Sequence, residues 1–105
     1  MDCLTRKAFI SQPMKGKTLE AIRKERKRIE DMLVLNGYKP VDSVFENFPK
    51  IEGCYKSQEL AYLAKSLDLL AQCDGACFAP GWKNARGCLI EHECAEKYGI
   101  EILMD

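Results

Sequence analysis

The chain has 105 residues, and its 16 basic and 16 acidic residues leave a formal net charge of zero at pH 7. This length fits one domain, residues 1–105. A neutral chain is not typical of proteins that bind nucleic acid polymers by neutralising phosphates, or that dock on membranes through polybasic segments. No apolar run approaches the roughly 18 residues of a membrane-spanning helix, and the N-terminus lacks the apolar region of a signal peptide. We therefore expect a cytoplasmic protein that contacts neither membranes nor nucleic acid polymers.

The six cysteines, at positions 3, 54, 73, 77, 88 and 94, do not have the spacing of a metal site. None of them forms a C-x-x-C pair, and His92 is the only histidine, so the usual zinc ligand patterns are absent. Four of them, at 73, 77, 88 and 94, lie in apolar segments, where a thiol packs as a small hydrophobic side chain. Because cytosolic thiols are normally reduced, we expect no disulfide, no metal and no cofactor.

The N-terminal third predicts a strand followed by a long helix. A short apolar strand is expected at 7–11, and the loop after it contains Pro13 and Gly16. Thr18 is placed to cap a helix that extends to about Leu35, along which apolar residues recur at helical spacing. Its basic residues alternate with acidic ones, which indicates a solvated face held by pairs one turn apart. These basic residues are Lys24, Arg26, Lys27 and Arg28.

The middle of the chain predicts a second strand and a second helix. The strand is expected at 38–43, and an irregular connection follows at 44–56. The helix spans roughly 56–71 and carries an apolar stripe. The stripe consists of Leu60, Leu63, Ala64, Leu67, Leu70 and Ala71.

The C-terminal third predicts a strand, a helix and a last strand. Residues 75–79 are apolar throughout, as a strand covered on both faces should be. A loop at 80–87 leads into a helix at about 86–98, and the last strand is expected at 100–104. The alternation of strands and helices indicates right-handed crossovers and a parallel sheet. We expect a flavodoxin-like, three-layer α/β sandwich with four or five parallel strands in the order 2-1-3-4.

In such a sheet, ligands bind beyond the carboxyl ends of the strands, where the strand order reverses. The loops after the first and third strands meet there. The first of these loops brings Ser11, Gln12, Met14 and Gly16 to the predicted pocket. Asp42, at the end of the second strand, either accepts hydrogen bonds from a sugar hydroxyl or initiates a turn.

Glu91 is an anomaly in the last helix. At about 3.6 residues per turn, it falls in the middle of the face formed by Gly87, Cys88, Cys94, Ala95 and Tyr98. An ionisable group on a buried face is costly without a partner or a purpose. Its place in the first turns, near the positive end of the helix dipole, favours the ionised carboxylate. Glu91 is therefore either a nucleophile in the crevice or an ordinary acidic residue near a helix start.

Three residues of the loop before this helix are candidates for ligand contact. Trp82 either caps the sheet edge or offers a face to a planar ring, and its placement favours the ring. Asn84 either caps the helix, the favoured alternative, or faces the pocket. Arg86 either binds an anionic group at the helix start or pairs with a neighbouring carboxylate.

Three segments together resemble the nucleoside 2-deoxyribosyltransferase-like superfamily, and most closely its short bacterial and phage members. The segments are Phe9-Ile10-Ser11-Gln12-Pro13-Met14, Cys73-Asp74-Gly75-Ala76 and the run from Gly87 through Glu91 and Ala95 to Gly99. The resemblance covers nearly the whole chain. It implies a flavodoxin-like fold and cleavage of an N-glycosidic bond. The glutamate matched by Glu91 attacks the anomeric carbon of a 2-deoxyribosyl group, and a second base or water then takes the sugar.

The chain departs from this family at two positions. An aspartate of the second helix corresponds to Ser66, with Asp68 two residues further on. An acidic or hydroxyl residue six positions before the glutamate corresponds to Ala85. The resemblance implies a homodimer or higher homo-oligomer that takes a small nucleoside or nucleotide, with the pocket formed by the candidates above and Ser66. The alternative is a non-catalytic module that binds a nucleotide-like ligand.

Overall fold

The computed structural model describes residues 6–41 and 54–104, which form four strands, three α-helices and a short 3-10 helix. The bounds in chain order are β1 Arg6–Ser11, α1 Leu19–Leu35, β2 Tyr38–Val41, α2 Gln58–Leu70, β3 Gly75–Phe78, η2 Trp82–Asn84, α3 Arg86–Lys97 and β4 Glu101–Met104. None of the helices in these two stretches is long and apolar enough to cross a membrane.

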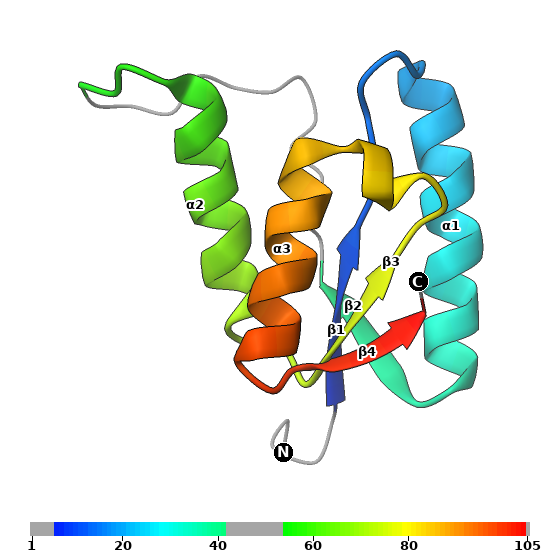
Figure 1. Ribbon diagram of the computed structural model, residues 1–105. Coiled ribbons are helices and arrows are strands. Elements are labelled where there is room, and N and C mark those ends of the chain that lie inside the picture. The colour runs from blue at the N-terminus through cyan, green and yellow to red at the C-terminus, as the bar shows by residue number, and fades with distance from the viewer. Residues whose placement is uncertain (1–5, 42–53, 105) are drawn as a thin grey trace.

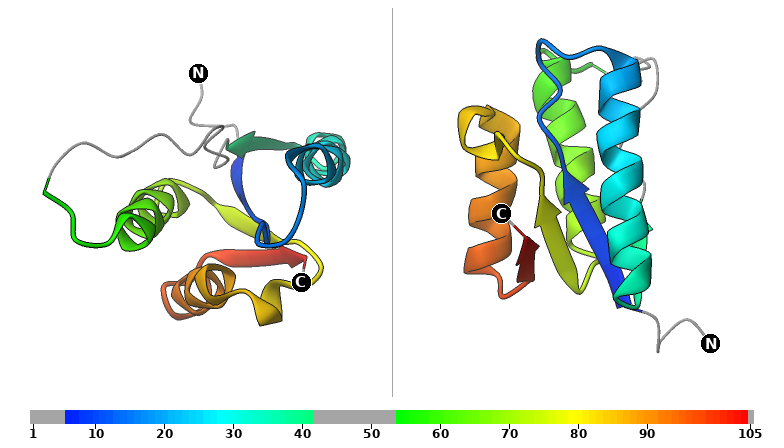
Figure 2. Two further views of the ribbon diagram at one scale, coloured as in Figure 1. Left: turned by 90° about the horizontal axis from the view of Figure 1, so that it is seen from above. Right: turned by 90° about the vertical axis from the view of Figure 1, so that its right-hand side faces the viewer.

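The four strands form one parallel sheet in the order β2-β1-β3-β4. Helix α1 covers one face of the sheet, and α2 and α3 lie on the other (Figure 1; Figure 2). The predicted flavodoxin-like α/β sandwich and its strand order are therefore confirmed. The strands β1 and β3 are neighbours at the centre, so the loops that leave their carboxyl ends lie at the same edge. A hydrogen bond of 2.9 Å from the Ala79 amide to the Ser11 carbonyl joins the starts of these loops.

Side chains alternate between the two faces of β1, as they do along any strand. Ala8 and Ile10 pack in the core beneath α1, whereas Phe9 packs in the core beneath α2 and α3. Ser11 is two residues beyond Phe9, so its side chain is directed to the α3 face at the end of the strand. This alternation determines which helix can contact the Ser11 hydroxyl.

The ends of α1 match the sequence prediction. The Thr18 hydroxyl accepts a hydrogen bond of 3.1 Å from the Ala21 amide, and the C-cap is Asn36. Its neighbour Gly37 has a positive φ of 85°, a conformation that favours glycine after a helix end.

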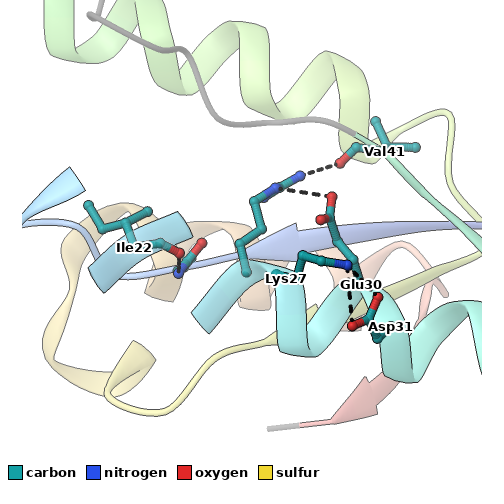
Figure 3. Close-up of polar contacts among 7 residues, drawn as sticks. Ile22, Lys27, Glu30, Asp31 and Val41 are labelled. Carbon is teal, nitrogen blue, oxygen red and sulfur yellow. Dashed lines mark hydrogen bonds and ion pairs between the residues drawn. The ribbon is translucent and has the colours of Figure 1, made fainter. Parts of the chain in front are cut away.

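The solvated basic face predicted for α1 is wrong at one residue, because Arg26 is buried. Its Nη2 donates a hydrogen bond of 2.8 Å to the Val41 carbonyl, and its Nε lies 3.5 Å from the Glu30 carboxylate. Figure 3 shows these contacts beside the exposed Lys27–Asp31 pair. The guanidinium is buried because it reaches a backbone acceptor at the end of β2, whereas the other three basic residues remain exposed.

The apolar stripe predicted for α2 is wider than the face of this helix that is buried against the rest of the protein. Leu70 is buried, but Leu60 is 64% exposed, and Ala64 and Ala71 are also exposed. Ala61, which the stripe omitted, is buried instead. The neighbouring Tyr62 and Leu63 are partly buried.

Candidate active site

An open cleft of about 880 Å³ lies at the carboxyl ends of β1 and β3. The loop after β1, helix α2 and the segment from Pro80 to Glu91 form its walls. We call the buried residues Ser11, Cys88 and Glu91 the cleft floor, and the exposed residues Glu59 and Arg86 the cleft rim. Further lining residues are Phe9, Ile10, Gln12, Pro13, Met14, Lys15, Lys17, Tyr62, Leu63, Ser66, Pro80, Gly81, Asn84, Ala85 and Gly87.

Glu91 occupies the cleft floor and is 8% exposed. It shares the buried face of α3 with Cys88 and Ala95, as the helical pattern predicts. Tyr98, which the pattern placed on the same face, is the C-cap and is 83% exposed, because the helix ends before it. The Ser11 hydroxyl donates a buried hydrogen bond of 2.6 Å to Glu91 Oε1. The last residue of β1 thus contacts the second turn of α3 across 80 positions of the chain.

Burial raises the pKa of Glu91 to about 7, and the Ser11 hydrogen bond lowers it by a smaller amount. The helix dipole was predicted to keep this carboxylate ionised. This prediction was wrong, although the helix begins at Arg86 as expected. Glu91 is its sixth residue, the dipole acts mainly within the first turn, and burial has the larger effect on the pKa. Both protonation states of Glu91 are therefore populated near neutral pH.

Cys88 lies beside this pair. Burial raises the pKa of its thiol, and a hydrogen bond with the Ser11 side chain partly offsets the rise. The thiol is therefore protonated at neutral pH. The other described cysteines are free thiols, of which Cys73 and Cys77 are buried, Cys94 is partly buried and Cys54 is exposed.

The loop after β1 is fastened to α1 through Gln12. Its Nε2 donates hydrogen bonds of 2.8 Å to the Ile22 carbonyl (Figure 3) and 2.9 Å to Glu25 Oε1. Lys17 Nζ lies 3.5 Å from the same Glu25 oxygen. Gln12 and Met14 line the cleft as predicted, whereas Gly16 does not. The buried Oε1 of Gln12 has no hydrogen-bond partner among the described residues.

Trp82 does not line the cleft, contrary to the favoured interpretation of its position. It is 8% exposed and stacks on His92, with ring centroids 4.0 Å apart and an interplanar angle of 7°. Phe78 packs against it at 5.7 Å. Gly81 has a left-handed φ of 90°, and this turn directs the indole into the core, where burial of a large ring is favourable.

The two polar candidates before and within α3 do line the cleft. The N-cap of α3 is Ala85, without a side-chain hydrogen bond, so the capping role favoured for Asn84 is wrong. Arg86 Nη2 donates a hydrogen bond of 2.7 Å to Glu59 Oε2 between two exposed side chains. Of the two alternatives for Arg86, this structure contains the pairing with a carboxylate.

Ser66 lines the cleft, and so do three residues of the same helix that were not predicted. These are Glu59, Tyr62 and Leu63. They precede Ser66 by seven, four and three residues, a spacing that places all four on one face of a helix. This spacing could have identified them from the sequence. Asp68 is exposed and does not line the cleft, and Asp42 lies outside the described residues. Within residues 6–41 and 54–104, no group of three or more potential ligands could hold a metal ion.

The chain belongs to a protein family defined as a domain of unknown function, DUF4406, whose model matches residues 6–104. No curated protein matches the chain significantly.

Proposed function

We propose that this DUF4406 member cleaves the N-glycosidic bond of a nucleoside or nucleotide and transfers the 2-deoxyribosyl group to another base or to water. The proposal also places the chain in the nucleoside 2-deoxyribosyltransferase-like superfamily, on the sequence segments that resemble it. The observation that carries the proposal is the buried carboxyl of Glu91 in the cleft floor, hydrogen-bonded to the Ser11 hydroxyl.

The surroundings of Glu91 are typical of a reactive carboxyl rather than a structural one. A buried structural carboxylate normally pairs with a cation. Two cations of the cleft have other carboxylates as partners, since Arg86 binds Glu59 and Lys17 lies beside Glu25. Glu91 instead faces a neutral hydroxyl, and its pKa of about 7 is the kind of shift that clusters at functional sites.

The reaction proceeds in two displacements, by the logic of retaining glycosidases. In the first, a Glu91 carboxylate oxygen forms a bond to the anomeric carbon. The bond from that carbon to the base nitrogen breaks, its electron pair stays on the base, and water in the open cleft supplies the proton. In the second, the nitrogen of an acceptor base or a water oxygen attacks the anomeric carbon and loses a proton. The ester bond breaks and its electron pair returns to Glu91.

The cleft suits a ligand of this size and chemistry. Its volume of about 880 Å³ is within the common range for small-molecule sites, roughly 300–1,000 Å³. Tyr62, Leu63 and Met14 offer an aromatic and apolar wall to a base. Ser66 and Asn84 offer hydrogen bonds to a sugar, and the cationic Lys15 suits a phosphate.

The proposal is tested by incubation with a panel of 2-deoxynucleosides, their monophosphates and free bases. We expect chromatography to show base exchange or base release, and intact-mass measurement to show one 2-deoxyribosyl group on the protein. Glu91→Gln should abolish both, with turnover reduced by at least about 10³-fold. Glu93→Gln, an exposed glutamate of the same helix, is the matched control and should leave both unchanged. Absence of exchange, release and adduct across the panel would contradict the proposal.

One observation favours the alternative of a non-catalytic binding module. Among the described residues that line the cleft, the carboxyls are Glu59 and Glu91, and Glu59 is exposed and bound to Arg86. Ser66 stands where the related family has an aspartate. A binding module would show a ligand-induced rise in melting temperature without turnover, and the rise would survive Glu91→Gln.

The proposed homo-oligomer is supported by exposed leucines near the cleft. Leu60 in α2 and Leu89 in α3 are 64% and 44% exposed, and burying them against a second copy would add to the small core of a 105-residue chain. Light scattering coupled to size exclusion should give a mass of at least two chains. A monomer at all concentrations would contradict this part of the proposal.

A further inference from the structure

The hydrogen bond between Ser11 and Glu91 is well isolated from solvent. Both side chains are more than nine-tenths buried, and their oxygens are 2.6 Å apart, a length typical of a hydroxyl bound to a charged carboxylate. A serine hydroxyl has one proton to donate. That proton is directed at Oε1, so the bond distinguishes the two oxygens of Glu91.

The Cys88 thiol is a neighbour of the same hydroxyl. Its interaction with the Ser11 side chain lowers the pKa of the thiol, whereas burial, the larger cause, raises it. The thiol therefore does not compete as an anion for the serine proton. Glu91 Oε1 is the acceptor of that proton.

We propose that Ser11 is a positioning residue: its hydroxyl holds Oε1 of Glu91, leaves Oε2 as the oxygen that bonds to the sugar, and speeds release of the sugar from the ester. This inference rests on the proposed function. It assigns to Ser11 a role through Glu91 rather than the substrate contact that the sequence suggested.

The effect on release follows from the charge on Oε1. When Oε2 forms its bond to the anomeric carbon, the carboxylate becomes an ester and Oε1 becomes a neutral carbonyl oxygen, so the Ser11 bond weakens. When a water oxygen attacks that carbon and loses a proton, the Oε2–carbon bond breaks. Its electron pair restores the carboxylate charge, which Oε1 shares, and the Ser11 bond strengthens. Ser11 therefore stabilises the departing carboxylate more than the ester.

The first measurement requires no turnover. Carbon-13 NMR of labelled glutamate carboxyls, recorded against pH, gives the pKa of Glu91 once Glu91→Gln identifies its signal. In Ser11→Ala we expect this pKa to rise by about one unit, the scale of one hydrogen bond to a charged group. Ser11→Cys, which keeps a weak donor, should give an intermediate rise. Cys77→Ala, buried in β3 beneath α1, should give none.

Other titrating groups must be followed in the same experiment, because they share the cleft with Glu91. The groups that line the cleft are Lys15, Lys17, Glu59, Tyr62, Arg86 and Cys88. Cys88→Ala keeps both the Ser11 donor and its acceptor, so we expect the pKa of Glu91 to change less than in Ser11→Ala. A change as large as that of Ser11→Ala would overturn the inference, because the pKa would then not depend on the Ser11 hydrogen bond.

The second measurement is the lifetime of the sugar adduct, followed by intact mass after substrate is removed. In Ser11→Ala we expect the adduct to persist about tenfold longer, with a smaller effect in Ser11→Cys. An unchanged pKa of Glu91, or an adduct that decays as fast as in the wild type, would overturn the inference. If the wild type forms no adduct, the proposed function and the release step both fail, and the titration alone decides whether Ser11 holds Glu91.

Discussion

Two glutamates line the same cleft in opposite surroundings. Glu91, in the cleft floor, is 8% exposed and accepts a hydrogen bond from a neutral serine. Glu59, at the cleft rim, has a side chain that is 82% exposed and pairs with Arg86 across 27 positions of the chain. Burial raises the pKa of Glu91 to about 7, whereas an exposed ion pair in water contributes little to stability and is easily exchanged.

The difference separates a part of the cleft that is fixed by the core from a part that can adapt. The cleft floor is built from the end of β1 and the second turn of α3, both packed on the sheet, so its geometry is determined by the core. The cleft rim is built from the first turns of α2 and α3, whose exposed side chains can change partners when a ligand enters. Mutations can separate the contributions of these two regions.

The largest expected effect on stability is at Trp82, which is buried in the core and does not line the cleft. Replacing this buried tryptophan by alanine removes its stack on His92 and its contact with Phe78. We expect a loss of about 3–5 kcal/mol in the free energy of unfolding, as for other buried aromatic residues, measured by urea denaturation. Tyr62→Ala is the control. Tyr62 lines the cleft and is only partly buried, so ligand affinity should change more than stability. A larger loss of stability in Tyr62→Ala than in Trp82→Ala would mean that Trp82 is not part of the core.

A second effect, of about 3 kcal/mol, comes from the cleft floor and depends on pH. The pKa of Glu91 is about 7 in the folded protein against an ordinary value of 4.5, so the unfolded chain loses this proton first as the pH rises. The contribution of Glu91 to stability therefore falls between about pH 4.5 and 7 and is constant outside that window. Glu91→Gln does not titrate, so its stability relative to the wild type should rise across the window.

Urea denaturation of both proteins at pH 4.5, 6 and 8 measures this difference. Glu93→Gln, on the exposed face of the same helix, should show no comparable pH dependence. A constant difference between Glu91→Gln and the wild type would show that the carboxyl of Glu91 is not buried as the structure has it.

The smallest expected effect is at the cleft rim itself. In a double-mutant cycle of Arg86→Ala and Glu59→Ala, we expect a coupling energy below about 1 kcal/mol that decreases as salt is added. A larger or salt-independent coupling would mean that the cleft rim is as rigid as the cleft floor.

The fold followed closely from the sequence, because its signals are local and periodic. The strands, the helices and the order β2-β1-β3-β4 follow from the alternation of apolar strands with amphipathic helices. The burial of Glu91 was visible in the pattern of α3, since residues one turn away are small or apolar. Its role in chemistry remains a prediction.

The contacts within the site were harder to predict, because they depend on how elements far apart in the sequence pack. The bond from Ser11 to Glu91 requires the end of β1 to lie against the second turn of α3. Trp82 was assigned to the cleft because of its place in the loop, but the left-handed Gly81 turns it inward. The burial of Arg26 depends on the Val41 carbonyl, which a charge pattern does not reveal.

The amide of Gln12 can adopt one orientation only, and this has a consequence for attempts to stabilise the protein. The two partners of its amide nitrogen, the Ile22 carbonyl and the Glu25 carboxylate, are acceptors, so turning the amide over would set oxygen against oxygen. Its own buried oxygen thus stays unsatisfied among the described residues, at a cost of roughly 1–3 kcal/mol. An apolar side chain of similar length would relieve that cost and would also detach the loop that bears Met14 from α1. Thermostability and a fixed cleft wall are therefore opposing demands on this single side chain.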